Sequence, residues 1–331
     1  MPSLPDIPRE FLSLSQRIGS DHLLVQGGGG NTSFKQDGVL WIKASGTELS
    51  RAGTDDIFVA VDESRALAEL DGTGDGTCRE AAIGSRSNNL PSIETTFHAL
   101  LPHRFVFHYH SVRSLVHSIA IEGRQTLNDK LAGLNWVSVP YIRPGIPLSK
   151  EIRRAFLETN ADIFVLENHG LIVAGSDCPR IAETIAELEN RLDMPTRNVD
   201  AETGTPLSLQ GWKPCPRAAS LANDNLSRVR AAAGSYYPDH VVFLGPGIDV
   251  VTIEQLTPRS DCYGPAMVIP SVSSYLREEA PRAAESMLIC LNDILVRIPD
   301  GWKLQPLSPE AEAELLGWDA EAHRKRMATQ S

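Results

Sequence analysis

The segment 105–110 places two histidines, His108 and His110, two residues apart where a short apolar run ends. Residues with this spacing on a strand point to the same face, so we expect the two imidazoles to lie side by side. Two neutral imidazoles form half of a divalent metal site. A histidine near a strand end is also commonly an ordinary, partly buried residue. The pair alone therefore leaves a metal site and a structural role both open.

A third histidine, His169, stands between Asn168 and Gly170, directly after a second apolar run at 163–166. Glu94 comes shortly before the histidine pair. Three histidines with one carboxylate make a coherent catalytic metal centre, with three protein ligands, a position for substrate or water, and an acid/base group. The sequence therefore indicates an enzyme, with His108, His110 and His169 as candidate metal ligands and Glu94 as a candidate acid/base, although the motif alone leaves a structural role for the histidines equally open.

The charge balance argues against polyanionic partners. The chain has 42 acidic and 31 basic residues and a formal net charge of −11. An acidic chain is a poor candidate for binding nucleic acid or an anionic membrane, so we expect a small-molecule substrate. The five cysteines form no Cys-x-x-Cys pair, the N-terminus lacks an apolar signal core, and no stretch of about 18 apolar residues exists. These features predict a cytoplasmic protein.

Short β-rich runs are mixed with helical patterns over the first part of the chain, which predicts an α/β or α+β class. Residues 195–216 are rich in proline, glycine and threonine and have the pattern of a linker. We therefore predict a catalytic domain over 1–195, a linker over 196–216, and a smaller C-terminal α/β domain over 217–331. In that last part, residues 240–244 are expected to form a strand.

Two loops offer groups for an anion. Four glycines, ending at Gly30, precede Asn31, and successive free amides in such a loop make an anion-binding nest. Lys43, Ser45 and Gly46 follow the next predicted strand and add an ammonium, a hydroxyl and an amide. Each of these residues can also be an ordinary turn former. No Gly-Lys-Ser/Thr follows the glycines, and no clear strand precedes them, so neither a P-loop nor a dinucleotide fingerprint is indicated.

The motifs occur in a familiar order along the chain: Gly-Gly-Asn31-Thr-Ser, Ala-Ser45-Gly-Thr, Pro-Ser92-Ile-Glu94, His108-Tyr-His110 and Asn-His169-Gly. In this order the chain resembles the class II aldolase/adducin family over about residues 10–195. The likeness is greatest to the aldolase half of the bifunctional rhamnulose-1-phosphate aldolase/alcohol dehydrogenase proteins. No Gly-x-Gly-x-x-Gly follows the tail, so the dehydrogenase activity is not expected here.

The resemblance implies a three-layer α/β/α fold around a largely antiparallel sheet and a homo-oligomer, a cyclic tetramer with its sites between subunits. It implies one divalent ion per subunit, Zn²⁺ first and Mn²⁺ or Mg²⁺ as alternatives, on the three histidines. It also implies a pocket for a substrate phosphate that includes Asn31, Ser45, Gly46 and Ser92. One departure is Ile93, which stands where simpler fuculose-phosphate aldolases have a second hydroxyl residue. Lys43 is a candidate replacement cation.

The activity that the resemblance implies is that of a metal-dependent aldolase, a lyase that cleaves a carbon–carbon bond of a ketose or ketose phosphate. The metal would stabilise the enediolate, and Glu94 would move its proton. The same site also suits a decarboxylase, an epimerase or a dehydratase acting on a sugar-derived keto acid or a sugar phosphate. A non-catalytic scaffold of the adducin kind is the alternative of another class, but a scaffold has no need for three histidines and a glutamate in register.

Overall fold

The computed structural model describes residues 6–83, 89–199, 204–256 and 263–318. The chain divides into two compact units. The first comprises Met1–Ser114 and Asn128–Leu192, and the second comprises Leu115–Leu127 and Asp193–Ser331. Each unit is described by itself.

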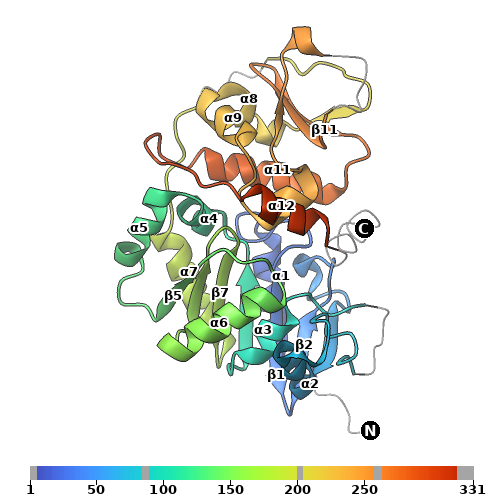
Figure 1. Cartoon of the computed structure of the whole chain (residues 1–331), viewed down its shortest axis with the longest axis vertical. Helices are drawn as coiled ribbons and strands as arrows, with labels where there is room; N and C mark the ends of the chain where they lie inside the picture. The colour runs from blue at the N-terminus through green and yellow to red at the C-terminus, as the bar shows by residue number, and fades with distance from the viewer. Residues whose placement is uncertain (1–5, 84–88, 200–203, 257–262, 319–331) are drawn as a thin grey trace. The chain divides into compact units, whose positions relative to one another are not determined.

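A sheet forms the middle of the first unit (Figure 1). It has seven strands in the order β3-β2-β1-β4-β7-β6-β5. Neighbouring strands are antiparallel except for β5 and β6, which are parallel. The strands are β1 (Asn31–Gln36), β2 (Val39–Lys43), β3 (Phe58–Asp62), β4 (Phe105–Tyr109), β5 (Trp136–Val139), β6 (Ile163–Leu166) and β7 (Gly170–Gly175). Strand β4 is therefore central, and its residues are hydrogen-bonded on both sides.

Helices cover both faces of this sheet (Figure 1). One face carries α1 (Arg9–Ser20) and α7 (Cys178–Arg191), which contact each other and strands β4 and β7. The other face carries α2 (Glu63–Ala68), α3 (Thr95–Leu100) and α6 (Ile146–Thr159). The predicted three-layer α/β/α fold with a largely antiparallel sheet is confirmed.

Successive side chains of β4 point to opposite faces of the sheet, so the strand contributes to the core on both faces. Phe105 and Phe107 join Phe11 of α1 on one face, with ring centroids 5.9 and 5.6 Å from that of Phe11. Val106 points the other way, into a cluster that includes Phe97 of α3 and Ile152 of α6. The strand is apolar on both faces because helices bury both, and this burial holds its end in place.

The second unit contains a four-stranded sheet in the order β8-β11-β10-β9. Its strands are β8 (Trp212–Pro214), β9 (Asp249–Val250), β10 (Ala266–Ile269) and β11 (Ser273–Arg277). Its helices are α8 (Ser220–Asn223), α9 (Asn225–Ala232), α10 (Pro238–Leu244), α11 (Arg282–Leu295) and α12 (Pro309–Leu316). This arrangement confirms the smaller α/β part that the sequence predicts.

The prediction of a strand at 240–244 is wrong, because these residues belong to helix α10. Pro238 occupies the first turn, where a missing N–H costs nothing, and Asp239 complements the helix dipole there. All seven residues of α10 are buried. Asp239 and His240 are buried together with the apolar run 241–244, so no exposed polar face marks the helix, and periodicity cannot distinguish its sequence from that of a buried strand.

The predicted linker, 196–216, contains strand β8 and Arg197, whose guanidinium donates to the carbonyl oxygen of Leu295. The second unit also includes Leu115–Leu127, which comes from the early part of the chain. This segment covers parts of two helices, α4 (Val112–Ser118) and α5 (Ile121–Lys130). There the Ile121 amide donates to the carbonyl oxygen of Lys303. The division into domains at 195 and 216 stays a prediction. No helix in the described part of the chain is long and apolar enough to cross a bilayer.

Candidate metal centre

Strand β4 carries the histidine pair to the middle of the sheet. His108 lies opposite Asn31 of β1 on one side and Ile172 of β7 on the other. His110 follows directly after the strand, and its Nε2 lies 3.1 Å from the Nε2 of His108. Both side chains are buried. The expected same-face arrangement of the two imidazoles is present.

His169 reaches the pair from the turn that joins β6 to β7. Asn168 adopts a left-handed conformation (φ 56°), which asparagine tolerates better than most residues, and the His169 amide donates to the carbonyl oxygen of Leu166. This tight turn places the His169 ring centroid 4.8 Å from that of His108 and 5.1 Å from that of His110. The three ligand atoms all lie within 4.8 Å of one another.

The donor set fits a divalent ion. Tetrahedral Zn–N bonds of 2.0–2.1 Å separate ligand nitrogens by about 3.3 Å, close to the spacing of His108 and His110. His108 Nδ1 lies 3.0 Å from the carbonyl oxygen of Leu171 and donates to it, which leaves the Nε2 lone pair toward the other two histidines. A backbone partner of this kind commonly orients a metal-binding imidazole.

Two glycines allow the neighbouring chain to approach the histidine strand closely. Gly30 has φ +60°, and a Cβ at this position would lie 2.9 Å from the carbonyl oxygen of His108. Gly170 has φ +156°, and a Cβ there would lie 2.4 Å from the carbonyl oxygen of Tyr109. A side chain at either position would push the strand that presents the histidines.

Glu94 precedes α3 and directs its carboxyl group at the histidines. Its Oε2 lies 3.5 Å from His108 Nε2, its Oε1 lies 3.6 Å from His169 Nε2, and the residue is 5% exposed. Burial by itself raises the pKa of Glu94. The charges of His108 and His169 and a hydrogen bond from Asn31 outweigh burial and lower this pKa to about 2. The lowered pKa favours the ionised form of Glu94 beside the candidate ligands.

Asn31 and Ser92, both predicted for a phosphate pocket, lie against Glu94. The Asn31 Nδ2 donates to Glu94 Oε2 at 2.7 Å and to the Ser92 hydroxyl at 3.2 Å. That hydroxyl also accepts from the Glu94 amide at 3.2 Å. In this structure both side chains hold Glu94, and their role toward a phosphate stays a prediction.

The two predicted anion-binding loops lie side by side and are tied together by Lys43. Its ammonium donates to the carbonyl oxygens of Gly28 and Thr47 at 3.0 and 2.6 Å. Gly46 lies against Gly28, since a Cβ on Gly28 would be 3.4 Å from the Gly46 carbonyl oxygen. The Ser45 amide donates to the carbonyl oxygen of Leu90, which brings this loop to the segment that leads to Ser92. The Lys43 ammonium therefore binds backbone carbonyl oxygens of the two loops, and a role for it as a cation that binds substrate stays a prediction.

Comparison with known families decides which fold family this arrangement represents. Residues 9–195, more than half of the chain, match the model of the class II aldolase and adducin N-terminal domain. The chain belongs to the class II aldolase/adducin family. The match contains all the predicted site residues, from Gly30 to His169.

Individual relatives are similar to somewhat more than half of this chain. The uncharacterized oxidoreductase YuxG of Bacillus subtilis (strain 168) is 33% identical over 187 residues, which are 52% of this chain and 27% of YuxG. The chain thus spans about a quarter of that curated relative. The solved N-terminal class II aldolase domain of a conserved protein from Thermoplasma acidophilum is 30% identical with a TM-score of 0.49, covering 58% of this chain and 94% of that one. L-fuculose-1-phosphate aldolase from Thermus thermophilus is 16% identical with a TM-score of 0.38, covering 56% and 93%.

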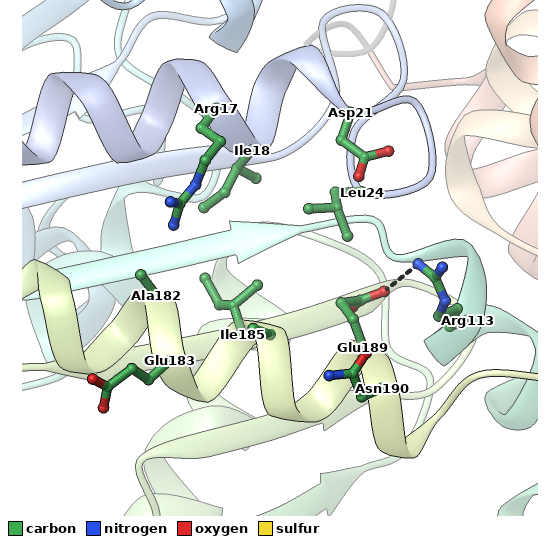
Figure 2. Close-up of a pocket in the computed structure, with 11 residues that line it drawn as sticks. Arg17, Ile18, Asp21, Leu24, Arg113, Ala182, Glu183, Ile185, Glu189 and Asn190 are labelled. Carbon is green, nitrogen blue, oxygen red and sulfur yellow. Dashed lines mark hydrogen bonds and ion pairs between the residues drawn. The ribbon is translucent and has the colours of Figure 1, made fainter.

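A groove on the opposite face of the sheet contains polar residues that the sequence did not single out (Figure 2). It lies between α1 and α7 and encloses about 560 Å³. Glu189 of α7 accepts from the Ser111 hydroxyl at 3.0 Å and from Arg113 at 3.2 Å. Burial raises the pKa of Glu189 to about 7, although Ser111 and Arg113 act to lower it. The only sequence signal was an acid on the apolar side of an amphipathic helix.

His98 of α3 is a second residue whose role the sequence did not indicate. It is fully buried, and burial lowers its pKa well below the ordinary value. Its Nε2 lies 2.5 Å from the Asn31 Oδ1, and its Nδ1 lies 2.7 Å from the Ser33 hydroxyl. The signal available was its spacing of four residues from Glu94, which places both near one side of a helix.

Proposed function

We propose that this class II aldolase-family protein is a metal-dependent lyase that cleaves a carbon–carbon bond of a ketose or ketose phosphate. The observation that carries the proposal is the buried cluster of His108, His110 and His169 with the Glu94 carboxyl group 3.5–3.6 Å from two of them. Family membership supports lyase chemistry at this cluster. Burying a carboxylate beside three imidazoles is costly unless a cation at the same place balances its charge.

The three histidines would hold one divalent ion, with Zn²⁺ as the first expectation. Neutral imidazole ligands leave the ion its full double charge, and such an ion acts as a Lewis acid on the oxygens of a carbonyl substrate. His108 is oriented for this by its bond to the Leu171 carbonyl oxygen, and Gly30 and Gly170 leave room for the backbone of its strand.

Glu94 would carry the proton. In the condensation direction its carboxylate takes a proton from the carbon beside the substrate carbonyl, and the electron pair of that C–H bond passes toward the carbonyl oxygen. In the cleavage direction the hydroxyl group on the departing carbon gives up its proton, and that carbon becomes an aldehyde. The electron pair of the broken carbon–carbon bond passes toward the carbonyl oxygen, and a proton then reaches the carbon beside the carbonyl through the Glu94 carboxyl group. The lowered pKa of Glu94 favours the ionised carboxylate, which is the form that the condensation direction needs.

A substrate phosphate would be held by the loops around Gly30, Ser45 and Gly46, with Ser92 beside them. The Ser45 amide is already bonded to the Leu90 carbonyl oxygen, and Ile93 supplies no hydroxyl. The donors available for a phosphate are therefore few, so free ketoses belong in the substrate panel together with ketose 1-phosphates. The family assembly that we propose is a homotetramer, which light scattering of the purified protein tests.

The decisive experiment measures bound metal by elemental analysis and, on the same preparation, products from ketose 1-phosphates, free ketoses and 3-keto acids. We expect about one divalent ion per chain and an aldehyde product from a ketose. Carbon dioxide from a keto acid, or an epimer without cleavage, would instead assign the alternative reactions of the same site. A metal-free protein with no turnover would contradict the proposal and favour a scaffold.

A further inference from the structure

Four buried side chains form a hydrogen-bonded row that ends on Glu94. Ser33 Oγ lies 2.7 Å from His98 Nδ1, and His98 Nε2 lies 2.5 Å from Asn31 Oδ1. Asn31 Nδ2 lies 2.7 Å from Glu94 Oε2. Asn31 and Ser33 point the same way because they are two residues apart on β1, and that face is the one that His108 occupies on β4.

The chemistry of the four groups admits one assignment of the hydrogens. The Asn31 Nδ2 lies within donating distance of both Glu94 Oε2 and the Ser92 hydroxyl, so its carbonyl oxygen is the atom that faces His98. That oxygen has no hydrogen, so His98 Nε2 must carry one. A fully buried, neutral imidazole carries a single hydrogen, so Nδ1 accepts and the Ser33 hydroxyl donates to it.

The two carboxyl oxygens of Glu94 therefore have different surroundings. Oε2 is held by Asn31 and lies 3.5 Å from His108 Nε2. Oε1 is buried, has no hydrogen-bond partner among the described residues, and lies 3.6 Å from His169 Nε2. The hydrogen bond to Oε2 thus fixes the orientation of the carboxyl group, while the lone pairs of Oε1 are available to accept a proton.

We propose that His98 is a positioning residue. As the Nε2–H tautomer it sets the Asn31 amide, which holds Oε2 and leaves Oε1 as the atom that takes and returns the substrate proton. The assignment of the tautomer stands without the proposed function, whereas the role of Oε1 in proton transfer rests on that proposed function. Without His98 the buried Asn31 carbonyl oxygen would lose its donor, and the amide would be held only from the side of Glu94 and Ser92, so its grip on Oε2 would loosen.

The tautomer is tested first, on the full chain without substrate. Nitrogen-15 NMR of protein labelled at histidine distinguishes a protonated from an unprotonated ring nitrogen, and the His98→Gln variant identifies the His98 signals by their loss. We expect a protonated Nε2 and an unprotonated Nδ1 at neutral pH. A protonated Nδ1, alone or with Nε2, would overturn the proposal whatever the protein catalyses.

The positioning role is tested with two neutral amides at residue 98. The side chain of His98→Gln can reach the Nε2 position and donate to Asn31, whereas that of His98→Asn reaches only the Nδ1 position. We expect His98→Gln to keep most of kcat and His98→Asn to lower it about 10²-fold, because a misplaced catalytic group costs that much. KM and metal content should stay unchanged in both. Equal kcat values in two folded variants would contradict the proposal.

A matched control is His103→Gln. His103 lies in the same unit, its Nε2 contacts Asp162 Oδ1 at 3.0 Å, and it is not part of the row. Its kcat should equal that of the unmodified protein. Should the His98→Asn variant not fold, the tautomer measured in the unmodified protein still decides the first half of the proposal, and its result does not depend on finding a substrate.

Discussion

Strand β4 separates two buried carboxyl groups that behave in opposite ways. Glu94 lies on the face of His108, and Glu189 lies on the face of Tyr109, whose buried hydroxyl is beside it. Their exposed fractions are similar, 5% and 8%. Yet the pKa of Glu94 is lowered to about 2, and burial raises that of Glu189 to about 7.

The difference lies in their partners. Glu94 is surrounded by imidazoles and receives a hydrogen bond from Asn31, so its ionised form is favoured despite burial. Glu189 has Arg113 and Ser111 on one oxygen, while its Oε1 has no hydrogen-bond partner among the described residues, and Asp21 opposes its ionisation. Burial depth alone therefore does not set the state of a carboxyl group; the charges and donors around it do.

The largest effect is expected from removing a candidate metal ligand on the face of β4 that carries His108. His108→Ala should weaken metal binding by more than ~10²-fold and abolish turnover, because it removes a ligand and not just an outer partner. Tyr109→Phe changes the neighbouring side chain on the other face and should leave metal content unchanged. Elemental analysis after dialysis measures both. Full metal content in the alanine variant would sink the ligand assignment.

Next come the two carboxyl groups themselves. Glu94→Gln should lower kcat by ~10²–10⁴-fold with metal retained, because the amide cannot take a proton. Glu189→Gln keeps the same shape on the opposite face, and kcat should stay at the level of the unmodified protein. Steady-state kinetics with the substrate found in the panel checks the pair. Comparable losses in the two variants would mean that the two faces are coupled.

A third test uses pH. The folded-state pKa of Glu189 lies above the ordinary value of 4.5, so its contribution to stability is full below pH 4.5 and is lost as pH rises through about 7. The loss amounts to roughly 3 kcal/mol over that window. Glu94 stays ionised throughout the same window because its pKa is about 2.

The measurement is urea unfolding between pH 4.5 and 8 for the unmodified protein and for Glu189→Gln. Relative to the unmodified protein, the variant should gain free energy of unfolding as pH rises, because its amide has no proton to lose. Parallel pH curves for the two proteins would show that Glu189 titrates at its ordinary value.

The smallest effect concerns the backbone beside His108. Gly30→Ala should cost about 1–3 kcal/mol, since residue 30 has φ +60° and its Cβ would meet the His108 carbonyl oxygen at 2.9 Å. Gly38→Ala has a similar φ of +75° with nothing within 4 Å, so only the backbone strain of about 1 kcal/mol remains. Urea unfolding compares them. Metal affinity should fall in the first variant only, and equal affinities would show that β4 absorbs the contact.

Much of the fold was readable from local patterns. The run at 105–110 predicted strand β4 and the shared face of His108 and His110, because side chains alternate along any strand. Helix α10 was misread because its residues 241–244 form a continuous apolar run, which has the same pattern in a buried helix and in a buried strand. The inclusion of 115–127 in the second unit was also invisible, since it depends on contacts with residues such as Lys303, far along the chain.

The sequence by itself determined which side chains could make a metal centre, because residue type and spacing are local properties. Only the tertiary structure decided how those side chains are used. It turned Lys43 onto backbone carbonyl oxygens, joined His98 to Asn31, and set Glu94 and Glu189 on opposite faces of one strand. The physical reason is that hydrogen-bond partners and pKa values depend on neighbours brought together by folding, which no single stretch of sequence specifies.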